Sequence, residues 1–182
     1  MVLLPMHDAT GQVYRCLYVP QPVPFSKLSA PMAEADYLAA DWNDPTAEVP
    51  LSFLYEKLGE KLLVAESWQT VFPKAGVLIS SSISGGNLQT RFRQAAEAAP
   101  GRCWLALEQM SVSFPLPCPD GQGESVELPQ EEGFYAESLG CRYIHSPDRA
   151  ILFDTEETLE QKRNLAMNVG FSGWMNMQKH RR

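Results

Sequence analysis

The chain of 182 residues is short of positive charge: 15 lysines and arginines stand against 22 aspartates and glutamates, which gives a formal net charge of -7. Sequence-independent binding to nucleic acid or to an anionic membrane surface depends on clustered cations, so this balance argues against both kinds of partner. The single basic run, at residues 179–182, is a short terminal tail. The sequence also lacks an apolar stretch of the roughly 18 residues that a membrane span requires.

Cysteine is scarce as well, with four residues that form no C-x-x-C pair. Cys16 and Cys103 lie inside apolar runs, so we predict buried structural thiols at both positions. Because no histidine stands at ligand spacing either, the sequence predicts no metal site and no cofactor. Isolated thiols are typical of a reducing compartment, and residues 1–6 have neither the basic start nor the apolar length of a signal peptide. We therefore expect a cytoplasmic protein.

Short and almost continuously apolar runs alternate with helical segments along the chain. Strands are predicted at residues 12–19, 35–42, 61–66, 76–81, 103–110, 140–145, 150–153 and 171–176. Helices are predicted over residues 51–58, from an Asn87 cap to Pro100, and from an Asp154 cap to Gly170. Strands buried on both faces and separated by helices are typical of parallel sheets, so the pattern predicts an α/β fold.

The chain length restricts this fold. At 182 residues it falls below the roughly 200 residues of a full barrel with its helices. We therefore predict a single domain over residues 1–182, folded as a compact or reduced TIM-like (β/α) barrel in which several crossover helices are shortened to loops. A barrel with so few helices leaves apolar strand faces uncovered, which predicts either an incomplete barrel or a partner subunit, such as a second copy in a homodimer.

Several predicted strands end in acidic residues, and in parallel α/β folds the carboxyl ends of the strands carry the chemistry. Glu66 and Glu108 each follow an apolar run, and Asp41 ends another. Glycoside hydrolysis uses a pair of carboxylates, so we assign Glu108 as the proton donor and Glu66 or Asp41 as the second carboxylate. The alternative is that these acids form ion pairs at the barrel rim with Arg15, Arg91 or Arg142.

The same strand ends supply side chains that suit a carbohydrate or another small polar ligand. Tryptophan rings offer apolar faces to sugar rings, and amide groups bind hydroxyls. The predicted ligand contacts are Trp42, Trp68, Gln109, Trp174 and Asn176. A competing interpretation uses residues 84–87, where backbone N–H groups ahead of a helix would hold the phosphate of a small molecule.

The last third of the chain contains a recognisable series of segments. It begins with L-A-L-E-Q-M-S-V-S-F-P-L-P from Leu105, continues through Tyr143 and A-I-L-F-D from Ala150, and closes with G-F-S-G-W-M from Gly170. These segments resemble the closing portion of family-18 glycoside hydrolases, the chitinase-like group, and especially its spore-associated members.

This resemblance implies a (β/α) barrel with a sugar-binding origin. By position, Trp174 would form the floor of a sugar subsite, and Tyr143 joins the candidate substrate contacts. The catalytic D-x-x-D-x-D-x-E strand of the family has no counterpart in the sequence. Two functions follow as expectations: a carbohydrate-binding protein that hydrolyses glycosides, or a non-catalytic, degenerate barrel that serves as a binding or assembly protein.

Overall fold

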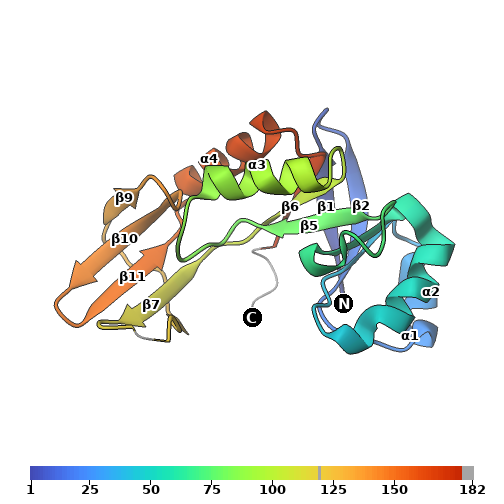
Figure 1. The fold of residues 1–182 in the computed structure, drawn as a ribbon, viewed down its shortest axis with the longest axis horizontal. Helices are drawn as coiled ribbons and strands as arrows, with labels where there is room; N and C mark the ends of the chain where they lie inside the picture. The colour runs from blue at the N-terminus through green and yellow to red at the C-terminus, as the bar shows by residue number, and fades with distance from the viewer. Residues whose placement is uncertain (119, 178–182) are drawn as a thin grey trace.

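A computed structural model of the protein describes residues 1–118 and 120–177, so the basic run at residues 179–182 lies outside the described part. Its centre is a closed barrel of seven strands (Figure 1). In their order around the barrel they are β1 (Val2–Asp8), β12 (Gly173–Asn176), β6 (Cys103–Leu107), β5 (Gly76–Ser80), β4 (Leu62–Ala65), β3 (Tyr37–Ala40) and β2 (Val13–Val19). Every neighbouring pair from β2 through β6 to β12 is parallel.

The first strand breaks this parallel arrangement, because β1 runs antiparallel to both β2 and β12. The turn that reverses the chain is closed by the Asp8 carboxylate, which accepts hydrogen bonds from the backbone N–H groups of Thr10 and Gln12. Gly11 has a φ of 89°, a conformation that favours glycine. The barrel is therefore mixed, and the predicted TIM-like (β/α) barrel is wrong.

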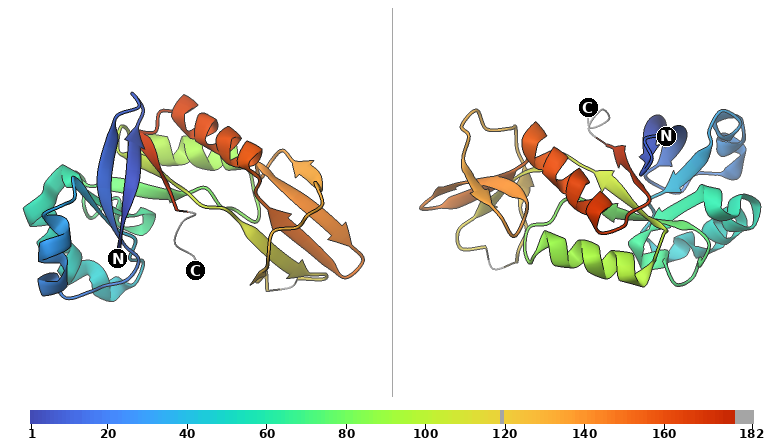
Figure 2. Two further views of the ribbon diagram at one scale, coloured as in Figure 1. Left: turned by 180° about the vertical axis from the view of Figure 1, so that it is seen from behind. Right: turned by 90° about the horizontal axis from the view of Figure 1, so that it is seen from above.

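The structure also contains a second sheet, which the predicted barrel did not include. Its five antiparallel strands project to one side of the barrel (Figures 1 and 2). Their order is β8 (Glu124–Ser125), β7 (Ser111–Pro115), β11 (Arg149–Phe153), β10 (Cys141–Ser146) and β9 (Phe134–Ala136). The predicted strands at residues 140–145 and 150–153 form a hairpin in this sheet. Their short connection fits only antiparallel neighbours, since a parallel crossover needs a dozen residues or more.

Four helices in the described chain connect the parallel barrel strands. They are α1 (Phe25–Met32), α2 (Glu48–Leu58), α3 (Leu88–Ala98) and α4 (Glu156–Asn168), supplemented by the 3-10 turns η1 (Pro45–Ala47), η2 (Gly59–Lys61) and η3 (Glu66–Trp68). The predicted Asn87 cap of α3 is confirmed, because its side chain accepts the Thr90 N–H at 2.9 Å. The first cap residue of α4 is Thr155 and not Asp154, with Thr158 completing a reciprocal capping box.

The barrel lumen is filled by side chains from all seven strands. They form one buried cluster of Leu4, Met6, Cys16, Ala39, Leu63, Leu78, Trp104 and Met175. Since successive side chains on a strand point to opposite faces, the residues between them pack outward against the helices. Leu62 and Val64 accordingly belong to the cluster beneath α1 and α2, and Leu105 to the cluster beneath α3 and α4.

The predicted buried thiols are confirmed. Cys16 in the lumen and Cys103 beneath α3 are both free and buried. Burial disfavours the thiolate, and it raises the pKa of Cys16 to about 12 and that of Cys103 to about 11. Both side chains therefore act as small apolar groups that pack the core.

Candidate functional site

The carboxyl ends of the parallel strands open into a pocket at one mouth of the barrel. Its volume is about 540 Å³. The lining residues are Met1, Val2, Leu4, Tyr18, Pro20, Glu108 and Met177. The chain therefore places one acidic group and one phenol among apolar side chains at the end of the barrel where parallel α/β folds carry their chemistry.

Glu108 reaches this mouth because it lies directly after β6 and in phase with Trp104, which points into the lumen. The Ser81 hydroxyl holds its backbone, accepting the Glu108 N–H at 2.9 Å and donating to the Glu108 carbonyl at 3.3 Å. The Ser80 hydroxyl donates to Glu108 Oε2 at 3.5 Å. The last residue of β5 and the residue that follows it thus hold one carboxylate oxygen and the backbone of the candidate acid.

Asp41 lies at the same end of the barrel and is joined to the pocket through Tyr18. The Tyr18 hydroxyl donates to Asp41 Oδ2 at 3.0 Å. Tyr18 comes from β2 and lines the pocket itself, so its ring and hydroxyl connect the second carboxylate to the cavity. Tyr18 was not among the predicted site residues, although the alternation of Tyr14, Cys16 and Tyr18 marks one face of the predicted strand.

Glu66 occupies a different environment. It follows β4 in phase with the outward-facing Leu62 and Val64, and its Oε2 lies 2.8 Å from an Arg91 nitrogen on α3. Both side chains are more than one-third exposed. This is the rim ion pair that the alternative interpretation described, and it directs the Glu66 carboxylate toward α3 and away from the lumen.

We expect the change Glu66→Gln to alter the free energy of unfolding by no more than about 1 kcal/mol, because exposed ion pairs contribute little. Urea denaturation of the variant and the parent protein measures this difference. A loss of about 3 kcal/mol or more would contradict the interpretation of this pair as an exposed rim ion pair.

Two of the predicted sugar platforms lie in the core. Trp42 and Trp68 are 2% and 8% exposed, respectively. The Trp42 indole N–H donates to the Val19 carbonyl, and that of Trp68 donates to the Trp42 carbonyl. Their rings pack between the barrel and its helices, and neither offers an open face to a ligand.

The other predicted contacts also lie outside the mouth pocket. Trp174 is on the outer wall of the barrel, stacked on His7 at 4.3 Å between ring centroids, with the Arg163 guanidinium 5.4 Å from its ring. Asn176 lies two residues further along the same outward side of β12. Gln109 donates to the Asp154 carbonyl, and Tyr143 contacts Phe134 in the second sheet. Of the predicted site residues, Glu108 lines the mouth pocket, and Asp41 is joined to that pocket by its hydrogen bond from the Tyr18 hydroxyl.

The described part of the chain also bears on metal binding and on membrane insertion. Residues 1–118 and 120–177 contain no cluster of three or more histidine, cysteine, aspartate or glutamate side chains placed to hold a metal ion. No helix within these same residues has the length and hydropathy of a membrane span.

No protein-family model matches the sequence, and no curated protein matches it. A solved structure with a similar fold is a glycoside hydrolase family 18 N-acetylglucosaminidase from Paenibacillus barengoltzii, with a TM-score of 0.58 and 11% sequence identity. The match covers 85% of this chain and 69% of that one. At this identity the likeness shows a related fold alone, and it extends beyond the C-terminal segments that resemble the family in sequence.

Proposed function

We propose that the protein binds carbohydrate at the mouth of its barrel. The observation that carries this proposal is the pocket of about 540 Å³, in which Glu108 and Tyr18 stand among apolar side chains. A sugar ring presents hydroxyls at its edge and C–H groups on its faces, so it needs both kinds of contact. Carboxylates accept charge-assisted hydrogen bonds from hydroxyls, and Val2, Leu4 and Met177 supply the apolar wall.

The structural neighbour guides the choice of sugar. The related fold belongs to an N-acetylglucosaminidase, so sugars that contain N-acetylglucosamine are the first ligands to test. The chain lacks the catalytic strand motif of family 18, and binding therefore does not imply turnover.

Glycoside hydrolysis is the second candidate function, and it is favoured by Asp41, which lies one hydrogen bond from the pocket that Glu108 lines. Glu108 would donate a proton to the leaving oxygen, while Asp41, oriented by the Tyr18 hydroxyl, would serve as the second carboxylate. Glu66 has no part in this arrangement because it is engaged by Arg91.

Replacing Glu108 tests both functions. We expect Glu108→Ala to weaken the binding of N,N′-diacetylchitobiose by about 10- to 100-fold, because a hydrogen bond to a charged group is lost. Isothermal titration calorimetry measures the affinity, and Glu66→Gln is the matched control. Unchanged affinity in Glu108→Ala would remove the mouth as the sugar site. If the parent protein cleaves a chromogenic N-acetylglucosaminide, Glu108→Gln should abolish that cleavage, whereas a parent protein without cleavage is a binding protein.

A further inference from the structure

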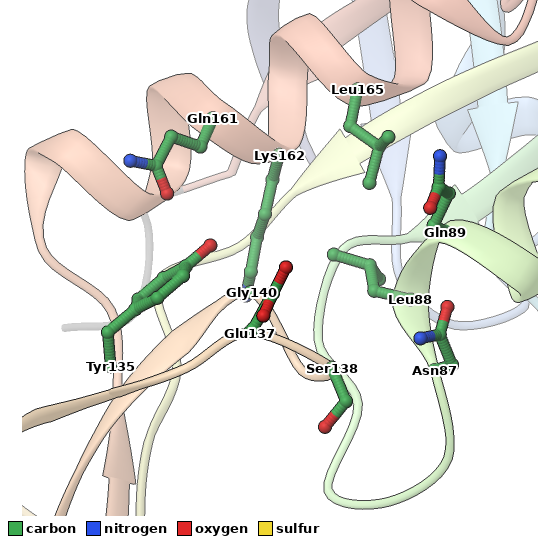
Figure 3. A pocket seen from close by; sticks show the side chains of 10 residues that line it. All are labelled: Asn87, Leu88, Gln89, Tyr135, Glu137, Ser138, Gly140, Gln161, Lys162 and Leu165. Atoms are coloured by element: carbon green, nitrogen blue, oxygen red, sulfur yellow. The ribbon is translucent and has the colours of Figure 1, made fainter.

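A second pocket, of about 580 Å³, lies outside the barrel wall between α3, α4 and the second sheet (Figure 3). The start of α3 contributes Leu88 and Gln89, and α4 contributes Gln161 and Leu165. The segment from Tyr135 to Gly140 contributes the remaining wall. In Figure 3, Tyr135 and Gln161 stand on one side of the opening, and Leu88, Gln89 and Leu165 stand on the other.

Few charged groups in the lining of this pocket are accessible to a ligand. Lys162 is among its lining residues, but its ammonium group lies 2.8 Å from Asp154 Oδ1 and its side chain is 1% exposed. That cation is already neutralised by a buried carboxylate. Glu137 is then the one ionised group of the lining that remains accessible, so the pocket repels anions.

The N-terminus of α3 does not reverse this preference. Its Leu88 N–H donates to the Ser138 carbonyl, and its Thr90 N–H donates to the Asn87 side chain. Two of the N–H groups that would hold a phosphate are therefore occupied within the protein. The first turn of α3 therefore offers few free donors beside residues 84–87, where a phosphate site was expected.

The polar groups that remain are neutral, and each can both donate and accept. Gln89 and Gln161 carry amides, and Ser138 and Tyr135 carry hydroxyls. Gln161 Nε2 already donates one hydrogen bond, to Glu157 Oε1 at 3.4 Å. Burial and the nearby Glu137 raise the pKa of the Tyr135 phenol, so it stays a neutral hydroxyl around pH 7. Beside these groups are the apolar side chains of Leu88 and Leu165 and the Tyr135 ring, a residue that is 46% exposed.

We propose that this pocket is a second ligand site, which binds a neutral polyhydroxylated molecule of the size of a mono- or disaccharide. The C–H face of the ligand would lie on the Tyr135 ring and its hydroxyls would bind the amides of Gln89 and Gln161. The volume lies within the range typical of small-molecule sites. This inference comes from the lining of the pocket and does not depend on sugar binding at the barrel mouth.

Amide chemical-shift changes on the ¹⁵N-labelled full chain test the proposal. The probes are cellobiose, maltose and N,N′-diacetylchitobiose, with glucose 6-phosphate as an anionic comparison. We expect at least one of the neutral disaccharides to shift the amides of Tyr135, Ser138 and Gln161, and glucose 6-phosphate to bind there at least about tenfold more weakly. Tyr135→Ala should weaken the neutral probe by about tenfold, since the aromatic face is lost.

Phe134→Ala is the matched control, because Phe134 is the preceding residue of β9 and faces the opposite side of the sheet, where its ring contacts Tyr143. It should leave the affinity of the second pocket unchanged. No shift at these amides with any of the three disaccharides would overturn the proposal, as would an equal loss in Phe134→Ala and Tyr135→Ala. Glu108→Ala separates the two sites, since it should retain the shifts at Tyr135 whatever happens at the mouth.

Discussion

Replacing Lys162 with methionine should lower the free energy of unfolding by about 3–5 kcal/mol, because it leaves a buried carboxylate without its counter-charge. Asp154 and Lys162 are both almost completely buried and lie 2.8 Å apart. The carboxylate also accepts the Met110 N–H at 3.1 Å and the Thr158 hydroxyl at 3.0 Å. This network joins the connection between β6 and β7, the end of β11 and the first turns of α4, so it fastens the second sheet to the barrel. Urea denaturation measures the change.

Two controls separate the buried charge from other effects of the substitution. Arg163→Met removes the cation of the adjacent, half-exposed pair with Glu160 and should cost no more than about 1 kcal/mol. The double change Asp154→Asn with Lys162→Met removes both charges and keeps one acceptor oxygen, which can receive the Met110 N–H while the new amide NH2 group faces the Thr158 hydroxyl oxygen. It should be more stable than Lys162→Met alone, and a double variant that is less stable would contradict the buried-charge explanation.

The second large effect is expected at Gly173, where Gly173→Ala should destabilise the protein by at least about 3 kcal/mol. Gly173 lies in β12, opposite Asp8 of β1 and Trp104 of β6. A Cβ at this position would collide with the His7 carbonyl oxygen and would lie 2.5 Å from Trp104 Cζ3 and 2.8 Å from Asp8 Cα. Two of these three contacts are with backbone atoms of β1, which cannot move without opening the β1–β12 pairing.

Gly85→Ala is the control for this change. A Cβ at Gly85 meets no atom within 4 Å, and its φ lies outside the region that favours glycine. Its free energy of unfolding should stay within about 0.5 kcal/mol of the parent. Thermal or urea denaturation compares the two variants, and a Gly173→Ala protein as stable as Gly85→Ala would show that β1 can shift without cost.

Most of the secondary structure could be predicted because it depends on local patterns. The apolar runs from residue 61 to 66 and from 103 to 110 correspond to β4 and β6, and Asn87 caps α3. The first strand escaped prediction because Pro5 interrupts a short segment whose outward side chains are exposed. The short strands of the second sheet escaped because a proline- and glycine-rich stretch indicates a loop.

Only part of the candidate site could be predicted, because the sequence does not show to which side a residue at a strand end points. Glu66 and Glu108 both follow apolar strands, so both were predicted to belong to the site. Their directions differ because Glu66 is in phase with the outward-facing Val64, whereas Glu108 is in phase with Trp104 in the lumen. A strand that is apolar on both faces carries no mark of which face is which, and a shift of one residue exchanges them.

The sequence by itself determined the elements: strands buried on both faces, helices with their caps, buried thiols, and acidic groups at strand ends. Only the tertiary structure decided that β1 closes the barrel antiparallel, that the hairpin of β10 and β11 belongs to a separate sheet, and that Glu108 lines one pocket with Tyr18, whose hydroxyl bonds Asp41. The physical reason is the distance along the sequence over which each kind of interaction acts. Propensity and capping act over a few residues, whereas strand direction, register and the side of the barrel that a carboxylate faces depend on partners distant in the sequence, such as β1 and β12.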